Sequence, residues 1–568
     1  MNMQKLKVVV IGGVACGPKA AARIKRLNPE AQVTIIEKGE LLSYAGCGLP
    51  FYISGEIHDY KELMCTPTGV VRDTHYFKMV KDITVLNQTL AESIDRKNKI
   101  VKAVNTITGK TIELPYDKLV LATGGQPVTP PIKGIDLKGV NFLSTVEDAR
   151  KIRDQEKNLK GKNAVIIGGG LIGIEVTESF VKQGMNVTLI EKMDRVLPAL
   201  LDYEMAYHVH NELKSNGVTL VTNDSVISIN GDDQGNVKSV STESKEFPAD
   251  LVLIAIGTKP NTTLAKEAGL TIGITGGIVV NEHLQTSDPD IFAGGDCVEN
   301  KHLINGKPIF APMGSTANKH GRVIADNICG RKSSFKGVLG TAICKVFNMN
   351  IARTGLTEKQ AKEEGYDYIT VFNAAPDRAH YHPEAKLIII KLIVDKKTRK
   401  ILGAQIIGPG DVAKRIEVVI TTITNNATID DLAYYDLAYA PPFSPAIDNI
   451  MVTAHIAQNK LDNITKSITP IEVKQKIDNN EDFILLDVRS PQEFDQMRID
   501  DPRVILIPLG KLRESLHTLD KTKEIITFCK ISLRGYEAQR ILDGAGFNNV
   551  KFLDGGIICW PYNKIVNQ

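Results

Sequence analysis

The stretch NAVIIGGGLIGIEVTESFVKQGMNVTLIEK, residues 163–192, decides the fold of its part of the chain. A β-branched run ends in glycines with G-x-G-x-x-G spacing at Gly168, Gly170 and Gly173, and an amphipathic segment leads to a second apolar run that ends in Glu191. Such a strand–turn–helix–strand unit lets the pyrophosphate of a dinucleotide approach the helix N-terminus, while the acidic residue accepts hydrogen bonds from ribose hydroxyls. A carboxylate at Glu191 would repel a 2′-phosphate, so we expect NADH rather than NADPH here.

A less complete copy of the same unit lies at the start of the chain. The stretch KVVVIGGVACGPKAAARIKRL, residues 7–27, precedes a second apolar run that ends at Glu37. Gly12 and Gly17 hold the outer positions of the fingerprint, but Val14 replaces its middle glycine. Two copies, each with its strand, helix and acidic residue, predict two Rossmann-like dinucleotide-binding folds in one chain.

Three further motifs accompany these copies: YDKLVLATGG (116–125), ADLVLIAIGTKPN (249–261) and TSDPDIFAGGDCVE (286–299). Their order resembles that of the FAD- and NAD-dependent pyridine nucleotide-disulfide oxidoreductases over residues 5–455. The resemblance implies that the first fingerprint binds FAD, that the second binds NADH, and that Asp296 holds the ribityl chain of the flavin; the alternative role for Asp296 is a helix N-cap. By family position, the FAD site comprises Gly12, Gly13, Gly17, Glu37, Ala122, Thr123, Gly124 and Asp296, and the NADH site comprises Gly168, Gly170, Gly173, Glu191 and Gly257.

A different pattern begins after residue 467, with the stretches DFILLDVRSPQEF and KEIITFCKISLRGYEAQRIL. The second stretch reads as a strand that opens into a loop at Cys529 and continues as a helix. Backbone N–H groups that curl around one atom, together with the charge of Arg534, would lower the pKa of the Cys529 thiol and hold an anionic persulfide. With GFNNVKFLDGGIICW further on, these motifs resemble a rhodanese domain, although QMRI replaces the usual Gly-His-Ile. The competing interpretation of Cys529 is a buried structural thiol.

These resemblances predict the domain order of the whole chain. We expect an α/β architecture with two interleaved Rossmann-like domains, an α+β dimerisation domain and a C-terminal α/β rhodanese domain. The expected boundaries are 1–115 and 250–325 for the FAD-binding domain, 116–249 for the NADH-binding domain, 326–455 for the dimerisation domain, 456–467 for a linker and 468–568 for the rhodanese domain. The dimerisation domain implies a homodimer.

A single cysteine, Cys47, lies in the loop SYAGCGLPFYISG of the FAD half, where disulfide reductases of the family place a pair. Members with one cysteine there are either NADH oxidases and peroxidases, which cycle through a sulfenate, or coenzyme A disulfide and persulfide reductases, which cycle through a mixed disulfide or persulfide. The oxidases and peroxidases commonly carry a histidine in the FAD glycine turn, where this chain has Ala15. The cysteine loop itself closely resembles the coenzyme A disulfide reductase signature.

Two aromatic segments extend this resemblance: YAPPFS, which begins at Tyr439, and DRAHYHPEAK, which contains Tyr381 and His382. In the family, a tyrosine from each segment reaches the cysteine of the other subunit and can protonate the leaving sulfur. The resemblance implies that Tyr439 plays one of these roles and leaves the other between Tyr381 and His382. The alternative for both tyrosines is a structural place in the subunit interface.

Coenzyme A carries phosphates, which need cations. Lys19, Arg23 and Arg26 fall at positions i, i+4 and i+7 of the first predicted helix, hence on one face, close to the cysteine loop that follows. Arg72 is a further candidate by family position. The competing interpretation of the helix residues is a solvated basic face.

Together these features predict an FAD-dependent oxidoreductase that uses NADH to reduce coenzyme A persulfide, polysulfide or coenzyme A disulfide through Cys47, while Cys529 carries sulfane sulfur. Two alternatives stay open. One is an NADH oxidase or peroxidase that uses a Cys47 sulfenate, and the other is a sulfurtransferase whose flavin part serves mainly as a redox sensor.

The composition argues against other partners. The chain of 568 residues has a formal net charge of +3, from 69 basic and 66 acidic residues, and no long run of like charge, so we expect neither a nucleic-acid nor a membrane partner. No apolar run approaches the roughly 18 residues of a membrane helix, and the start lacks a signal-peptide pattern, so we expect a cytoplasmic protein. The eight cysteines show no metal-ligand spacing, so we expect no metal site.

Overall fold

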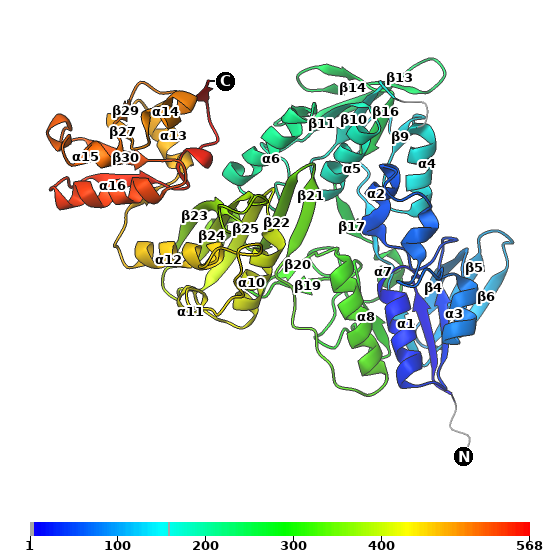
Figure 1. Ribbon diagram of the computed structural model, residues 1–568. Coiled ribbons are helices and arrows are strands. Elements are labelled where there is room, and N and C mark those ends of the chain that lie inside the picture. Colours follow the sequence, from blue (N-terminus) through cyan, green and yellow to red (C-terminus); the bar gives the residue numbers. More distant parts are fainter. Residues whose placement is uncertain (1–4, 157–159, 568) are drawn as a thin grey trace. The chain divides into compact units, whose positions relative to one another are not determined.

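A computed structural model describes residues 5–156 and 160–567 of the chain (Figure 1). The chain divides into two compact units, residues 1–193 with 217–338 and residues 194–216 with 339–568. The first unit contains both glycine fingerprints. The second contains the two C-terminal domains, together with one helix that lies between strands of the second fingerprint in the sequence.

The first fingerprint forms the centre of a five-stranded parallel sheet with the order β18-β7-β1-β2-β3. Helices α1 and α8 pack together on one face, and an antiparallel sheet of β4, β5 and β6 covers the other. The bounds are β1 Lys7–Ile11, α1 Cys16–Leu27, β2 Gln32–Ile36, α3 Thr74–Lys81, β3 Thr84–Leu86, β4 Thr89–Asp95, β5 Ile100–Asn105, β6 Thr111–Pro115, β7 Lys118–Leu121, β18 Ile291–Ala293 and α8 Gly314–Ile328. Because both faces of the sheet are covered, its strands are almost wholly apolar.

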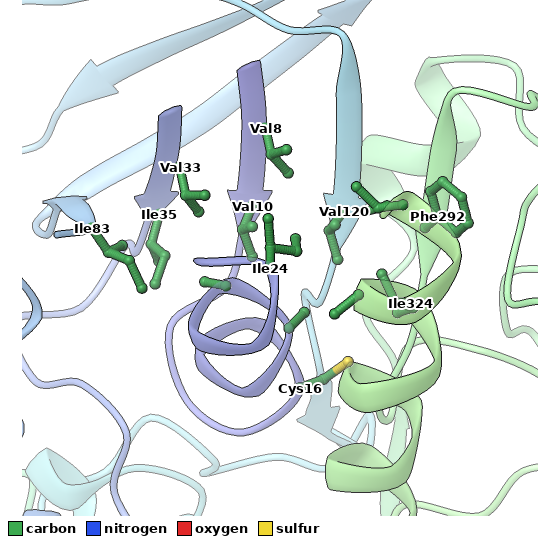
Figure 2. Close-up of a cluster of buried hydrophobic side chains, with 14 of the residues drawn as sticks. Val8, Val10, Cys16, Ile24, Val33, Ile35, Ile83, Val120, Phe292 and Ile324 are labelled. Carbon is green, nitrogen blue, oxygen red and sulfur yellow. The ribbon is translucent and has the colours of Figure 1, made fainter. Parts of the chain in front are cut away.

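Figure 2 shows how this core is filled on the helical face. Val10 of β1 and Ile35 of β2 point toward Ile24 of α1, and Ile324 of α8 closes the cluster from the side. The Cys16 thiol lies at the edge of the same cluster and is buried. Cys16 is therefore a core residue at the start of α1.

The second fingerprint forms a sheet of the same kind, with the order β12-β11-β10-β16-β9. Its β-α-β unit is β10, α5 and β11, and a small antiparallel sheet of β13, β14 and β15 packs beside it. The bounds are β9 Val140–Asn141, α4 Val146–Glu156, β10 Asn163–Ile167, α5 Leu171–Lys182, β11 Asn186–Ile190, β12 Thr219–Val221, β13 Val226–Gly231, β14 Val237–Thr242, β15 Glu246–Pro248 and β16 Leu251–Ile254.

Two strands near the expected domain boundaries pair differently from what the sequence suggests. Strand β7, which we place in the NADH-binding domain, hydrogen-bonds to β1 in the first sheet. Strand β16, which we place in the FAD-binding domain, hydrogen-bonds to β10 in the second sheet. The chain crosses between the sheets after these strands, at the short pair β8 (Gly125–Pro127) and β17 (Thr258–Pro260).

In the second unit, residues 342–461 form a five-stranded antiparallel sheet with the order β21-β22-β25-β24-β23, and helices pack on one face. The bounds are β21 Ala342–Val346, β22 Met349–Gly355, α9 Glu358–Glu363, β23 Tyr368–Pro376, β24 Leu387–Asp395, β25 Ile401–Gly408, α10 Val412–Thr424, α11 Ile429–Leu432 and α12 Asn449–Leu461. Helix α6 (Tyr203–Ser215) belongs to the same unit. Part of the expected linker is helical, since α12 extends to Leu461.

The C-terminal domain is a parallel sheet with the order β26-β31-β30-β27-β29. Its apolar strands are covered by helices, which gives two small cores. The bounds are β26 Ser467–Ile468, α13 Pro470–Asp478, β27 Phe483–Asp487, α14 Pro491–Gln496, β28 Met497–Ile499, β29 Val504–Leu506, α15 Leu509–Leu512, β30 Glu524–Phe528, α16 Leu533–Gly544, β31 Val550–Leu553 and β32 Lys564–Val566. In the described part of the chain, no helix is both long enough and apolar enough to cross a membrane.

Candidate active site

The glycine turns of both fingerprints leave no room for side chains at their outer positions. A Cβ at Gly12 would lie 2.0 Å from the carbonyl oxygen of Ala122, and a Cβ at Gly173 would lie 2.0 Å from that of Gly168. Gly12 and Gly168 also have φ values of +113° and +106°, which disfavour other residues. In contrast, a Cβ at Gly170 would meet its nearest atom only at 4.0 Å, so this glycine leaves open space at the start of α5. A phosphate group would use that space.

Each acidic residue at the end of the second strand binds back to its own glycine turn. Glu37 accepts hydrogen bonds from the N–H of Gly13 at 2.7 Å and from that of Gly39 at 2.8 Å. Glu191 accepts from the N–H of Gly169 at 2.7 Å and from that of Met193 at 2.8 Å. The two networks match residue for residue, so both carboxylates hold the turn in place and keep lone pairs free for a ribose.

Asp296 lies in the turn after β18, and its Oδ1 atom is buried without a hydrogen-bond partner among the described residues. Burial raises the pKa of this carboxyl to about 6. The residue does not begin a helix, since α8 starts only at Gly314, so the structure gives no support to the N-cap alternative. An unpaired, buried acceptor of this kind fits a hydroxyl donor from a bound flavin chain.

The segments that cross between the two sheets bind to each other. The Thr123 hydroxyl donates to the carbonyl of Asn261 at 2.6 Å, and the Asn261 N–H donates to the carbonyl of Gly124 at 2.9 Å. Gly124 and Gly257 both adopt positive φ values, +69° and +110°. Ala122 is the residue whose carbonyl excludes a side chain at Gly12, so this crossing also shapes the first glycine turn.

Cys47 sits in a single turn of 3-10 helix, Gly46–Gly48, directly before α2 (Leu49–Ile53). The residue is exposed. Partial burial of the thiol, followed by the negative charges of Glu175 and Asp296, raises its pKa. The polypeptide alone thus favours the neutral thiol, whereas the attacking form is the thiolate.

Glu175 is a site residue that sequence reasoning missed. It lies on α5, two residues after the last glycine of the second fingerprint, and acts electrostatically on Cys47. Burial, together with the charge of Glu178, raises its pKa to about 7. The sequence gives no distinct signal for this role, because Glu178 and Lys182 at positions i+3 and i+7 place Glu175 on the polar side of the helix.

Some of the basic residues expected to contact coenzyme A are exposed, and others are hydrogen-bonded within the fold. Lys19 and Arg26 of α1 are exposed. Arg23 instead forms two hydrogen bonds with Asp326 of α8, at 2.7 and 2.9 Å. Arg72 donates from Nε to the carbonyl of Met64 at 2.8 Å. The helix face is therefore only partly available to a phosphate.

The two candidate tyrosines lie on the surface of the domain that follows. Tyr381 is 67% exposed and Tyr439 is 52% exposed. They belong to a set of exposed large apolar residues in this domain, which also includes Tyr434, Phe443 and Ile447. His382 is not free in the same way, because its Nδ1 accepts a hydrogen bond from the N–H of Glu384 at 3.3 Å.

In the C-terminal domain, Cys529 follows β30 and is buried beneath a tight loop that leads into α16. Its carbonyl accepts from the N–H of Ile557 at 2.9 Å, and the carbonyl of Lys530 accepts from that of Ile558 at 3.1 Å. Ser532 completes the loop with a φ of +98°, and its hydroxyl is buried without a described partner. Ile557 and Ile558 thus hold the loop in place through their N–H groups, and the backbone of the loop is strained at Ser532.

Arg534 closes this site. Its guanidinium donates two hydrogen bonds to the carboxylate of Glu493, at 2.7 and 2.6 Å, and also interacts with the Cys529 thiol. Arg489 has a structural role instead, since it pairs with Asp487 at 2.6 Å. Sequence reasoning found Arg534 but not its carboxylate partner, which lies 41 residues away in the chain.

One acidic cluster has the geometry of a metal site. Asp202, Glu204 and Glu358 place carboxylate oxygens within 4.8 Å of one another. The ammonium of the buried Lys391 occupies their centre, 2.9 Å from Asp202 and 2.6 Å from Glu358, and also pairs with Glu204. The Lys391 ammonium therefore occupies the place that a metal cation would take in this cluster.

Comparison with known proteins agrees with this geometry. Residues 6–316 match the pyridine nucleotide-disulphide oxidoreductases, residues 341–451 match the dimerisation domain of that family, and residues 469–561 match the rhodanese-like domain. The chain therefore belongs to the pyridine nucleotide-disulphide oxidoreductase family and carries a C-terminal rhodanese domain. The expected fold class and the expected enzyme class, a flavin- and pyridine nucleotide-dependent oxidoreductase, are confirmed.

Individual relatives cover most or all of the chain. The NAD(P)H coenzyme A polysulfide/persulfide reductase of Pyrococcus horikoshii is 40% identical over 455 residues, which are 80% of this chain and 99% of that protein. The solved structure of an NAD-dependent persulfide reductase from A. fulgidus is 48% identical, covers 98% of this chain and 100% of its own, and has a TM-score of 0.93. That of a reduced CoADR-RHD from Bacillus anthracis is 36% identical, covers 99% and 98%, and has a TM-score of 0.92.

Proposed function

We propose that this chain uses NADH to reduce the sulfur–sulfur bond of coenzyme A persulfide, polysulfide or coenzyme A disulfide at Cys47, and that Cys529 carries sulfane sulfur for the same reaction. One observation carries the proposal: a single exposed cysteine in the flavin half and a second cysteine under a tight loop beside Arg534 occur in one chain. Relatives named as persulfide and coenzyme A reductases support this choice of substrate.

The chemistry follows from the reactivity of thiolates. The Cys47 thiolate attacks the outer sulfur of a persulfide, the S–S bond breaks, and the thiol leaves with a proton. Bound FAD would supply the electron pair taken from NADH. Two electrons then convert the Cys47 persulfide into the thiolate and sulfide. With a disulfide as substrate, the same steps pass through a mixed disulfide and release two thiols.

The candidate site residues have separate tasks in this proposal. Asp296 would accept a hydrogen bond from the flavin chain, because its buried Oδ1 lacks a partner. The negative charge of Glu191 disfavours NADPH. The exposed Lys19 and Arg26 would contact the phosphates of coenzyme A, while Arg23 keeps α1 and α8 together through Asp326. In a homodimer, Tyr439, with Tyr381 or His382, would donate a proton to the leaving sulfur at the partner subunit's Cys47.

Anaerobic NADH oxidation tests the proposal, with coenzyme A persulfide, coenzyme A disulfide and peroxide as alternative acceptors and with sulfide measured. We expect the persulfide to react fastest and to release one sulfide per NADH. Cys47→Ser should abolish this release, whereas Cys529→Ser should spare it for small persulfides. A wide lead for peroxide would show an oxidase or peroxidase, and survival of sulfide release in Cys47→Ser would point to the sulfurtransferase alternative.

A further inference from the structure

One carboxylate in the C-terminal domain has no part in the mechanism above but faces its cysteine loop. Glu493 lies in α14, and its Oε2 accepts from the N–H of Ser490 at 3.1 Å, while its own N–H donates to the Ser490 hydroxyl at 3.2 Å. This reciprocal pair is a capping box, which anchors the carboxylate to the start of the helix. The same carboxylate also receives both hydrogen bonds from Arg534.

The contact with Glu493 fixes the orientation of the Arg534 guanidinium plane as well as its position. Each carboxylate oxygen takes a hydrogen bond from a different guanidinium nitrogen, which leaves the guanidinium no freedom to rotate about a single bond. The hydrogen bonds to Arg534 lower the pKa of Glu493 to about 2, so the pair stays charged. The guanidinium in turn interacts with the thiol of Cys529. Glu493, Arg534 and Cys529 thus form a chain of contacts that begins at an anchored helix end.

We propose that Glu493 is a positioning residue of the sulfur-carrier site, which keeps an N–H group of Arg534 directed at the sulfur of Cys529. The inference rests on the proposed role of Cys529. Glu493 affects this sulfur in two opposite ways: through Arg534 it favours the thiolate, and through its own negative charge it disfavours it. We expect the first effect to be the larger, because Arg534 contacts both the carboxylate and the sulfur.

Two simpler roles make different predictions. If Glu493 only caps α14, its loss harms the site whether or not Arg534 is present. If Glu493 only adds negative charge, its loss favours the thiolate in both cases. Positioning alone predicts that the sign of the effect depends on Arg534, which is what a double-mutant cycle measures.

The experiment follows the alkylation of Cys529 by iodoacetamide in the full-length, FAD-loaded protein between about pH 6 and pH 9. The thiolate sulfur bonds to carbon as iodide leaves, so the rate reports the thiolate and needs no sulfur donor. Mass spectrometry of the peptide that contains Cys529 separates it from the other cysteines. Glu493→Ala and Glu493→Gln are each compared in the natural background and in Arg534→Met.

In the natural background we expect Glu493→Ala to slow alkylation near pH 7 about fivefold and to move its pH midpoint upward. Glu493→Gln keeps a capping acceptor and should show the same change at a smaller size. In the Arg534→Met background, Glu493→Ala should instead speed alkylation about twofold, since only the repulsion by its charge is then removed. If Glu493→Ala lowers the melting temperature, the alkylation rate of Glu493→Gln decides the test, because glutamine still caps the helix.

Glu472 provides the matched control. It occupies the same capping-box position in α13, where it accepts from the N–H of Thr469 at 2.8 Å, but no arginine pairs with it among the described residues. Glu472→Ala should leave alkylation of Cys529 within about twofold of the parent rate. Three results would overturn the positioning role. Glu472→Ala could slow alkylation of Cys529 as much as Glu493→Ala does, Glu493→Ala could change the rate in the same direction with and without Arg534, or Glu493→Ala could leave the rate unchanged. A Cys529 that resists alkylation in the unaltered chain would contradict the sulfur-carrier role itself.

Discussion

Burial and nearby negative charge together make the Cys47 thiol harder to ionise. Burial and the carboxylates of Glu175 and Asp296 act in the same direction and raise the pKa of the thiol. Since the thiolate is the nucleophile, these carboxylates oppose the reactive form whenever they are charged. The protonation state of Glu175, whose pKa is about 7, therefore couples the reactivity of Cys47 to pH in the neutral range.

Replacement of Glu175 by glutamine tests this coupling. Below pH 7 the natural carboxyl is protonated and neutral, so the variant should behave like the parent near pH 6. Above pH 7 the natural carboxylate is charged, so Glu175→Gln should speed alkylation of Cys47 about threefold near pH 8. Iodoacetamide labelling of the FAD-loaded protein with peptide mass spectrometry gives both rates.

Glu178→Gln is the control for this prediction. Glu178 lies on the same helix, pairs with Lys182 at 2.7 Å, and does not contribute to the raised pKa of Cys47. Its replacement removes one cause of the raised pKa of Glu175, but that carboxylate is charged near pH 8 in either case, so the labelling rate of Cys47 there should stay unchanged. Equal acceleration at both pH values in Glu175→Gln would show that the effect does not come from titration of this carboxyl.

At the scale of secondary-structure elements, the glycine turn before α5 contains two kinds of glycine. One is required for close backbone packing, and the other leaves space for a ligand. Gly173 packs against the carbonyl of Gly168, whereas Gly170 faces open space. We expect Gly173→Ala to destabilise the protein by about 2–3 kcal/mol through this backbone clash. Gly170→Ala should leave the melting temperature nearly unchanged and raise the KM for NADH.

Thermal unfolding and NADH kinetics of the two glycine variants check this contrast. The two substitutions add the same methyl group only three residues apart, so each serves as the control for the other. A drop in melting temperature for Gly170→Ala as large as that for Gly173→Ala would contradict the assignment of open space to the phosphate.

Helix α6 is tied to the sheet of the second unit through the buried ion cluster around Lys391. Burial opposes the charge on Lys391, but the three surrounding carboxylates outweigh it and raise its pKa. Lys391→Met would leave Asp202 and Glu204 buried without a counter-charge, which should cost about 3–5 kcal/mol at neutral pH. Without Lys391, Asp202 and Glu204 bind protons more tightly in the folded than in the unfolded state. The loss of unfolding free energy should therefore shrink as pH falls toward 5.

Urea unfolding of Lys391→Met at pH 7 and pH 5 measures this loss. Lys396→Met is a suitable control, since Lys396 forms an exposed pair with Asp367 and should change stability by less than about 1 kcal/mol. A loss that grew toward low pH would show that the cluster does not hold its carboxylates ionised through Lys391.

At the scale of the whole molecule, the dimerisation domain exposes large apolar side chains that a monomer would leave in water. Phe443 is 70% exposed and lies four residues from Tyr439. We expect Phe443→Asp to convert the dimer into monomers and to remove most reductase activity, because the proposed proton donors act across subunits. Analytical ultracentrifugation and NADH kinetics on the same sample measure both effects.

Ile274→Asp is the matched control for the interface. Ile274 is 88% exposed but lies in the first unit, outside the dimerisation domain. The control should remain dimeric and active. A fully active monomer of Phe443→Asp would contradict a role for Tyr439 at the partner subunit's Cys47.

Much of this protein is determined by local sequence. Glycine spacing dictates both dinucleotide folds, because only glycine tolerates the positive φ and the close backbone contacts at Gly12 and Gly168. The covered strands are recognisable from their continuous apolar runs, and the loop at Cys529 from a strand that leads directly into a helix. The family and its domain order follow from these local patterns in sequence.

Only the tertiary structure decides which distant charges meet. It brings Glu175 of the second fingerprint next to Cys47 of the first domain, ties Arg23 to Asp326, and joins Arg534 to Glu493. It also reassigns β7 and β16 between the two sheets, since strand pairing depends on partners far away in the chain. Electrostatic effects depend on distance in space and on burial, neither of which a linear pattern contains, so the pKa values at the active site are a property of the folded chain alone.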